Sequence, residues 1–119
     1  MIYTSYFGNW RKWKDHYPPI SIASRDPHYY TSGSVVGTRF EFISPAIPLI
    51  RGYKAGELTE NDYTALYYSQ FTDKQGLLRE FGEKFQDNVL LCYETSDKFC
   101  HRFLLSNLLI ALDFHVKEL

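Results

Sequence analysis

A short, continuous run of apolar residues in the last third of the chain constrains the fold most strongly. Val89 follows Asn88 and begins the run Val-Leu-Leu-Cys-Tyr, which ends at Glu94. The run has the length of a strand and no polar face. A strand of this kind suits the centre of a parallel sheet, where it is covered on both faces. The run therefore predicts a layered α/β fold.

Strand-like and helix-like segments alternate along the rest of the chain. Residues 2–7 and 20–24 are short and rich in β-branched or apolar side chains, which is typical of strands. Residues 115–119 fit a last, edge strand. Helical patterns cover residues 59–71, 74–85 and about 95–112. We expect Thr59 to cap the first of these helices, and Thr95 or Ser96 to cap the third with Asp97 in its first turn. The alternation predicts one α/β domain over residues 1–119, a small sandwich with a mainly parallel central sheet flanked by helices.

Residues 28–56 carry half of the glycines and prolines of the chain, the residues that most often break helices and strands. Six glycines and prolines fall in this segment, which favours loops or short irregular pieces with one extended run at 38–43. A loop of that length is unusual in a compact domain unless it has a function, such as a lid over a site.

The charge of the chain is almost balanced. The 119 residues have a formal net charge of −1, and 45% of them are hydrophobic, which is ordinary for a globular domain and excludes a disordered one. The balance gives no global attraction for nucleic acid or for anionic lipid, although a local basic patch could still bind either. The sequence leaves the oligomeric state open.

Neither an export signal nor a membrane span is expected from the sequence. The residues after Met1 are strand-like instead of basic and then apolar, and no apolar run reaches the roughly eighteen residues of a spanning helix. Two cysteines in a chain of this kind indicate a reducing compartment and free thiols. We therefore expect a cytoplasmic protein with free cysteines.

Polar, chemically versatile residues flank the loop that follows the apolar run. Cys92 and Glu94 lie at the strand end, and Cys100, His101 and Arg102 lie in the first turns of the next helix. Ligands of open α/β sheets bind beyond the carboxyl ends of the strands, where loops and helix N-termini meet. The short loop can therefore bring these five side chains together in one site.

The same residues carry a family resemblance. Leu-Leu-Cys-Tyr-Glu, the motif Phe-Cys-His-Arg-Phe-Leu-Leu and the closing Val-Lys-Glu-Leu resemble the C-terminal signature of the DUF488 family of bacterial, archaeal and phage proteins. The opening Ile-Tyr-Thr-Ser-Tyr-Phe-Gly-Asn and the segment Ile-Ser-Ile-Ala-Ser are similar to one branch of it. The resemblance implies a compact α/β fold with Cys92, Glu94, Cys100, His101 and Arg102 clustered. Other branches have an acidic residue before the arginine that follows the second strand; here Ser24 precedes Arg25.

Each of these side chains has a structural and a functional interpretation. Arg102 is poorly placed for the helix dipole, so it requires either a buried partner such as Glu94 or an anionic ligand. His101 is a candidate general acid or base, or a satisfied helix histidine. Cys100 is a candidate nucleophile near a helix N-terminus, whereas Cys92 on its apolar strand fits a small buried hydrophobe.

Metal and cofactor sites are not expected. Cys100 and His101 are adjacent, and on a helix they would point to different faces. Together with Cys92 they also lack a fourth ligand, so we expect no metal. No glycine-rich phosphate loop or nucleophile elbow is present, so no nucleotide cofactor is expected. A reversible Cys92–Cys100 disulfide stays open, because strand end and helix start can lie within bridging distance.

Two functional hypotheses follow. In the first, the chain is a small enzyme or enzyme-like domain that binds an anionic, nucleotide-like ligand through Arg102, Arg25 and Cys92. Cys100, His101 and Glu94 then supply the chemistry, and tyrosines form a stacking wall. In the second, the cluster only staples the fold, and aromatic loops bind a protein or single-stranded nucleic acid. Trp10 and Trp13, spaced i and i+3 among lysines and Arg11, fit a buried helix face better than a base-stacking surface.

Overall fold

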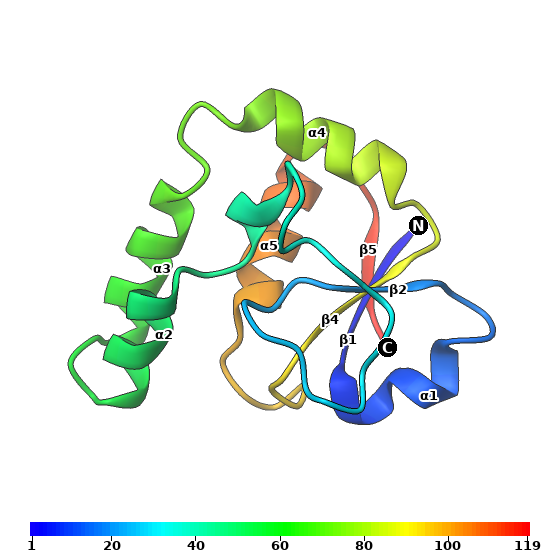
Figure 1. Cartoon of the computed structure of the whole chain (residues 1–119). Helices are drawn as coiled ribbons and strands as arrows, with labels where there is room; N and C mark the ends of the chain where they lie inside the picture. Colours follow the sequence, from blue (N-terminus) through cyan, green and yellow to red (C-terminus); the bar gives the residue numbers. More distant parts are fainter.

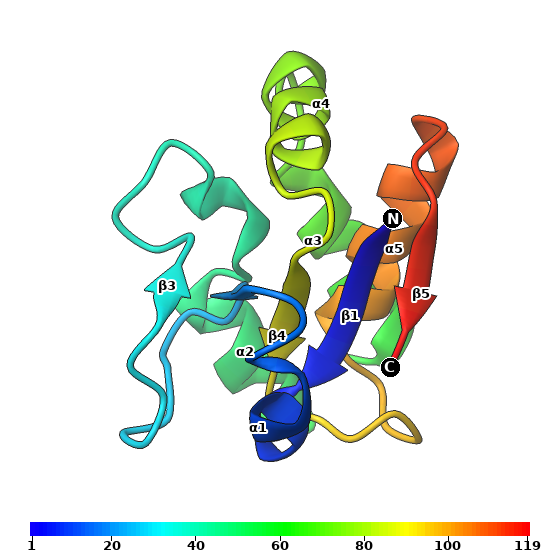
Figure 2. The ribbon, with the colours of Figure 1, turned by 90° about the vertical axis from the view of Figure 1, so that its right-hand side faces the viewer.

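The computed structural model describes all residues, 1–119, and contains a five-stranded, all-parallel sheet. The strand order is β3-β2-β4-β1-β5, which Figure 2 shows from β3 to β5 across the sheet. The strands are β1 (Ile2–Tyr6), β2 (Pro19–Ser21), β3 (Gly33–Ser34), β4 (Val89–Cys92) and β5 (Val116–Glu118). The helices are α1 (Trp10–Trp13), α2 (Ile47–Lys54), α3 (Glu60–Ser69), α4 (Gln75–Lys84) and α5 (His101–Ala111), with 3-10 turns η1 (Phe7–Asn9) and η2 (Glu41–Ile43). The predicted α/β sandwich with a parallel sheet is confirmed.

The apolar run forms the middle strand of the sheet. β4 pairs with β1 on one side and β2 on the other, and all four of its residues are buried. Its side chains alternate between the two faces: Leu90 and Cys92 belong to the larger core, and Val89 and Leu91 to the smaller one. The central, doubly covered strand predicted from the sequence is therefore confirmed.

The two faces of the sheet are covered unequally. Helices α2, α3, α4 and α5 contribute buried side chains to the larger core, and Figure 1 shows α2, α3 and α5 on the same side of the sheet. The opposite face carries α1, whose Trp10 and Trp13 pack with Tyr30 and Tyr17 over the smaller core. The tryptophans therefore lie on a packed helix face, as their spacing indicates. The Cys92 side chain also lies on the face of the sheet that carries the larger core.

The cap of α3 forms as its sequence predicts. The Thr59 hydroxyl accepts a hydrogen bond from the Asp62 backbone N–H at 3.1 Å, and the Asp62 carboxylate accepts one from the Thr59 N–H at 3.0 Å. This reciprocal pair satisfies two of the free donors at the helix start. These hydrogen bonds also lower the pKa of Asp62.

Residues 28–56 contain more regular structure than their sequence predicts. The expected extended run at 38–43 is wrong, because this part contains the 3-10 turn η2, and α2 lies in the segment expected to be loop. Pro48 lies in the first turn of α2, where a missing N–H costs nothing. Gly52 lies inside α2, where its missing side chain leaves room for Leu58: an added Cβ would lie 2.8 Å from Leu58 Cδ1. Both residues look like helix breakers in sequence, but one has a positional and the other a packing role.

The last helix begins later than expected. α5 starts at His101 with Cys100 as its N-cap in an extended conformation, so the predicted start at Thr95 or Ser96 is wrong. The Thr95 hydroxyl hydrogen bonds to the Asp97 carboxylate within the loop instead. Cys100 therefore lies just outside the helix, and His101 and Arg102 are its first two residues.

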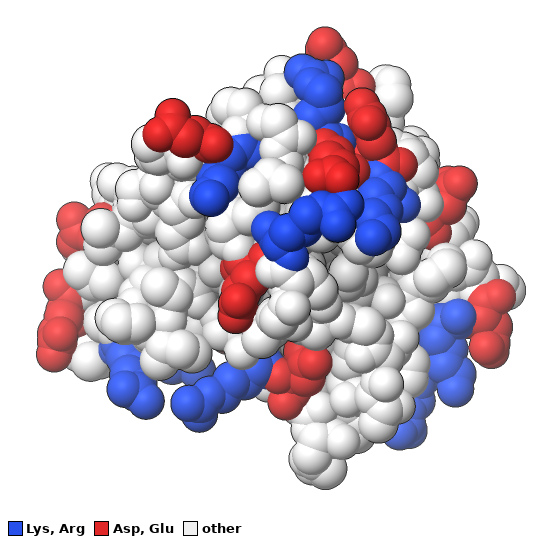
Figure 3. All heavy atoms as spheres, turned by 45° about the horizontal axis from the view of Figure 1, so that its top comes forward, with Lys and Arg blue, Asp and Glu red and all other residues white.

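On the face drawn in Figure 3, basic and acidic side chains are interspersed, which agrees with the balanced charge of the sequence. No helix in the fold combines the length and apolarity needed to cross a bilayer.

Two glycines of α4 should respond in opposite ways to alanine substitution. An added Cβ at Gly82 would lie 2.4 Å from the Phe114 ring, whereas one at Gly76 would meet nothing within 4 Å. We expect Gly82→Ala to lower the free energy of unfolding by about 1–3 kcal/mol through overpacking. Gly76→Ala should raise it by up to about 1 kcal/mol, because alanine favours a helix more than glycine does. Urea unfolding of the two variants tests this; equal effects would contradict the packing of Phe114 against α4.

Candidate functional site

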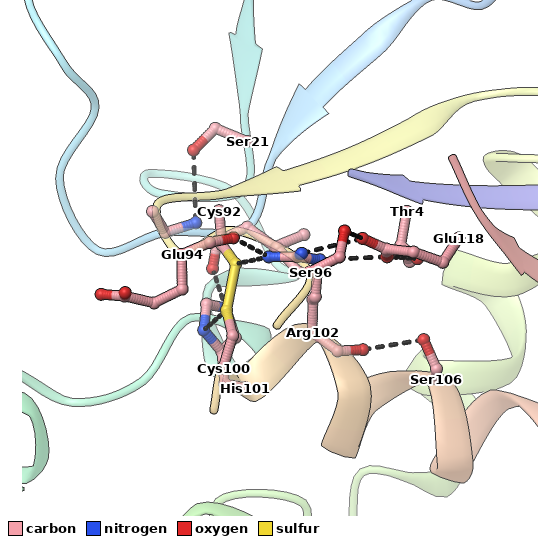
Figure 4. The surroundings of a disulfide bond; sticks show 12 residues. Thr4, Ser21, Cys92, Glu94, Ser96, Cys100, His101, Arg102, Ser106 and Glu118 are labelled. Atoms are coloured by element: carbon pink, nitrogen blue, oxygen red, sulfur yellow. Dashed lines mark hydrogen bonds and ion pairs between the residues drawn. A yellow bond between two sulfur atoms is a disulfide. The ribbon is translucent and has the colours of Figure 1, made fainter. Parts of the chain in front are cut away.

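The five predicted site residues lie where β4 ends and α5 begins. Cys92 is the last residue of β4, Cys100 is the N-cap of α5, and His101 and Arg102 follow it. These four residues are buried, with 0–6% of their surface exposed, whereas Glu94 is exposed. Figure 4 shows Cys92, Cys100, His101 and Arg102 side by side. Four of the five residues expected to cluster therefore do so, and the Glu94 side chain lies outside the group.

The two cysteines are joined to each other. Their Sγ atoms form a disulfide between the end of β4 and the start of α5, drawn in yellow in Figure 4. The expectation of free cysteines is therefore wrong for this structure, because the loop of residues 93–99 folds the helix start back onto the strand end. The bridge that the sequence left open is the observed arrangement.

His101 is held from both sides of its ring. Its Nε2 donates to the Ile22 carbonyl at 2.8 Å, which leaves Nδ1 3.8 Å from Cys100 Sγ, and the ring packs edge-on against Tyr67. The pKa of His101 is lowered to about 4, mainly by burial and also by the nearby positive charge of Arg102. The hydrogen bond to Ile22 raises the pKa, but its effect is outweighed. The imidazole is therefore neutral near pH 7, with a free lone pair on Nδ1.

Arg102 is the largest fully buried side chain of the protein, and most of its hydrogen-bond donors have partners within the fold. Its guanidinium donates to both carboxylate oxygens of Glu118 at 3.1 and 2.8 Å, to Cys92 Sγ at 2.9 Å and to the Glu94 main-chain carbonyl at 2.6 Å. Four of its five N–H groups are thereby used. The expected partner Glu94 contributes only its backbone, and its side chain points away in Figure 4. The predicted ligand clamp at Arg102 is therefore corrected: the residue binds the fold together.

Glu118 on β5 is the true partner of Arg102. Its carboxylate also accepts hydrogen bonds from the Thr4 hydroxyl on β1 and from the Ser96 hydroxyl at 2.7 Å. Burial alone would raise the pKa of Glu118, but the hydrogen bonds from Arg102, Thr4 and Ser96 outweigh it and lower the pKa below its ordinary value. In the sequence, Glu118 stands out only as part of the closing Val-Lys-Glu-Leu, and its distance along the chain from Arg102 hides the pair. The signal that could have found it is its place on the last predicted strand, whose neighbour in the sheet proves to be β1.

A cavity of about 650 Å³ opens beside the cluster. Cys92, Glu94, Cys100 and His101 line it, and so does Arg25, which follows β2. Arg102 does not line it. The cavity lies beyond the carboxyl ends of β2 and β4, which is where parallel sheets bind ligands. Four of the five clustered residues and Arg25 therefore share one concave surface.

The cavity wall is rich in positive charge. Arg51 and Lys54 from α2 and Lys98 from the loop before α5 line it together with Arg25, and Glu94 is its one acidic residue. None of the four cations takes part in an ion pair within the protein. Sequence reasoning missed Arg51 and Lys54, because it placed them in a loop. Their spacing of three residues puts them on one face once α2 is helical.

The cysteines and His101 also lie closer to one another than expected. The ligand atoms of Cys92, Cys100 and His101 all lie within 4.8 Å of one another. Contrary to the prediction from the sequence, Cys100 and His101 do not point to different faces of one helix, because Cys100 precedes α5 in an extended conformation. The backbone change between these two residues turns both side chains toward Cys92.

The Arg102–Glu118 pair should control acid stability. A carboxyl whose pKa is lowered on folding stabilises the protein above its unfolded pKa, and this contribution is lost as the pH falls through its folded pKa. We expect Glu118→Gln to lower the free energy of unfolding at pH 7 by about 2–3 kcal/mol. Urea unfolding between pH 7 and pH 3 measures it, and the difference from the wild type should shrink below about pH 4.

Glu83→Gln is the matched control for this experiment, because Glu83 on α4 is exposed and forms no ion pair. Its stability should follow that of the wild type at every pH. A difference for Glu118→Gln that stays constant down to pH 3 would mean that the carboxylate charge does not hold β5 to α5.

Comparisons with protein-family models, with curated proteins and with solved structures found no match to this chain.

Proposed function

We propose that this protein is a small cytosolic enzyme or enzyme-like domain that binds an anionic, nucleotide-like ligand in the cavity beside the Cys-x-Glu and Cys-His-Arg motifs. The observation that carries the proposal is the charge of the cavity wall: four cations without an ion-pair partner surround one carboxylate. Unpaired cations on a concave surface favour a ligand with phosphate or carboxylate groups.

The size and the aromatic lining of the cavity support a planar ligand. Its volume of about 650 Å³ falls within the range of small-molecule sites. Tyr53, Tyr63, Tyr93 and Phe99 line it, and Tyr93 is half exposed. Aromatic rings beside basic groups can stack on a base while the cations hold a phosphate. A nucleotide-like molecule combines these two features.

The groups that could act on such a ligand differ in accessibility. Glu94 is exposed on the wall and is the candidate proton-transfer group with the freest approach. His101 presents only Nδ1 to the cysteines, since Nε2 is engaged with Ile22. Cys100 lines the cavity but acts as a nucleophile only after its bond to Cys92 is reduced. In this proposal Arg25 binds the ligand, and Arg102 positions Cys92 and the Glu94 backbone.

Membership of the DUF488 family is part of the same proposal. Its support is that the quoted motif residues meet in space, and that Glu118 of the closing Val-Lys-Glu-Leu pairs with Arg102 of the Cys-His-Arg motif. Residues that resemble a signature and also form one network are what a shared fold would produce.

One observation favours the alternative, an interaction module in which the cluster is a structural staple. Arg102 has no exposed surface, and all its contacts are internal. In that case Tyr29 and Tyr93, which are 41% and 50% exposed, would contact a protein or a single-stranded nucleic acid.

Binding of adenosine monophosphate and of inorganic phosphate, measured by calorimetry and NMR shifts, separates these functions. We expect both to bind, the nucleotide more tightly because it can also stack. Arg51→Ala/Lys54→Ala should weaken both by at least about tenfold, because hydrogen bonds to a charged group contribute about 1.5–3 kcal/mol each. Tyr93→Ala should weaken only the nucleotide.

Arg11→Ala/Lys12→Ala on α1 is the control of equal charge change, because neither residue lines the cavity and both are exposed. It should leave both affinities unchanged. Absence of binding by the folded wild type, or an equal loss in the control, would reject the anion site and leave the interaction module.

A further inference from the structure

The backbones of Cys92 and Cys100 are farther apart than those of ordinary disulfides. Their Cα atoms are 7.5 Å apart, whereas disulfide-bonded cysteines usually have Cα atoms about 4.4–6.8 Å apart. The wider spacing suits two thiolates held by something between them. A tetrahedral zinc ion with bonds of about 2.3 Å separates two sulfurs by about 3.8 Å, or about 1.7 Å more than a direct bond. Adding this to the commonest disulfide spacing of about 5.5–6 Å gives about 7.2–7.7 Å.

His101 is placed as a third ligand. In a tetrahedral site a zinc-bound imidazole nitrogen and a zinc-bound sulfur lie about 3.6 Å apart, and His101 Nδ1 lies 3.8 Å from Cys100 Sγ. Its other nitrogen donates to the Ile22 carbonyl at 2.8 Å. Metal-bound histidines commonly donate their second N–H to a backbone carbonyl or a carboxylate, which fixes the tautomer and the ring orientation. The tautomer needed for coordination through Nδ1 is therefore already set.

The surroundings also suit two thiolates and a divalent ion. Arg102 donates to Cys92 Sγ at 2.9 Å, a hydrogen bond that favours the thiolate, and Glu118 balances the guanidinium charge. Two thiolates and one divalent ion sum to zero charge, which a buried site requires. Burial of all three ligands, each at most 6% exposed, keeps competing water from most of the site.

We propose that Cys92, Cys100 and His101 bind one zinc-type divalent ion when the disulfide is reduced. The reductant is two equivalents of a low-molecular-weight thiol, which together give two electrons and two protons to the Cys92–Cys100 bond and are joined in one small-molecule disulfide; metal binding then releases the two protons of the cysteine thiols. Three protein ligands leave one coordination position free, as in catalytic zinc sites. All three residues line the cavity, so this position faces it and takes a water or an anion. The proposal of this metal site does not depend on the proposal that a nucleotide-like ligand binds in the cavity.

Cobalt substitution tests the site directly. The protein is reduced with a phosphine, freed of metals with a chelator and titrated with Co²⁺ alone under argon. We expect one equivalent to produce a thiolate-to-cobalt absorption band in the near ultraviolet and visible bands typical of tetrahedral Co²⁺, and one equivalent of Zn²⁺ to remove both. Proton release on metal binding, followed with a pH indicator, gives a second readout. No anionic ligand is present, so the result does not depend on the anion site.

Variants then assign the ligands. Cys92→Ser, Cys100→Ser and His101→Ala should each weaken Zn²⁺ binding by at least about 100-fold, because even outer-shell changes cost about 10–100-fold. His115→Ala should bind as the wild type does, because His115 is exposed and lies outside the cluster. Wild-type protein oxidised to the disulfide should give no cobalt bands, a comparison that needs no variant to fold. A reduced, folded wild type that gives no thiolate band, or one that His101→Ala leaves unchanged, overturns the proposal.

Discussion

The buried guanidinium of Arg102 is the contact on which this site depends. It reaches from the first turn of α5 to the end of β4, to the backbone of the following loop and to Glu118 on β5. A cation in a helix first turn opposes the helix dipole, so it persists only where the neutralising partner is strong. Glu118, itself held by Thr4 and Ser96, is that partner. The strand, the loop and the helix that carry the candidate residues are thus fixed by one side chain.

The cluster has an interior side, formed by the Arg102–Glu118 ion pair, and a side that faces the cavity. Arg102 and Glu118 satisfy one another inside, and the cations that face the cavity come from other elements, the turn after β2, α2 and the loop before α5. Cys92, Cys100 and His101 lie between the two, in contact with the network and also on the cavity wall. In a metal site at these residues, Arg102 and Ile22 would hold the ligands through hydrogen bonds on the interior side. An anion would reach the metal from the cavity. The two proposals are independent in their tests, but they place their ligands in one cavity.

The sequence predicts the sheet better than it predicts the site. The apolar run of β4 and the cap of α3 specify local structure strongly, and both form as predicted. The α2 helix is not predicted because Pro48 and Gly52 normally disfavour helices. Both are compatible with α2 where they stand, since Pro48 lies in its first turn and Gly52 packs against Leu58. The ion pair was assigned to Glu94 because sequence proximity favours it. Glu118 is distant in sequence and becomes a neighbour only when β5 adds beside β1.

The contact between Arg102 and the main chain of residue 94 has one more consequence. The guanidinium recognises the carbonyl oxygen, a group that every amino acid supplies, so the hydrogen bond at 2.6 Å makes no demand on which side chain stands there. Position 94 can therefore be exchanged for neutral, basic or aromatic residues while the scaffold beneath keeps its hold on the loop. For protein engineers, residue 94 is therefore a position on the cavity wall whose side chain can be varied without loss of the hydrogen bond that holds the loop.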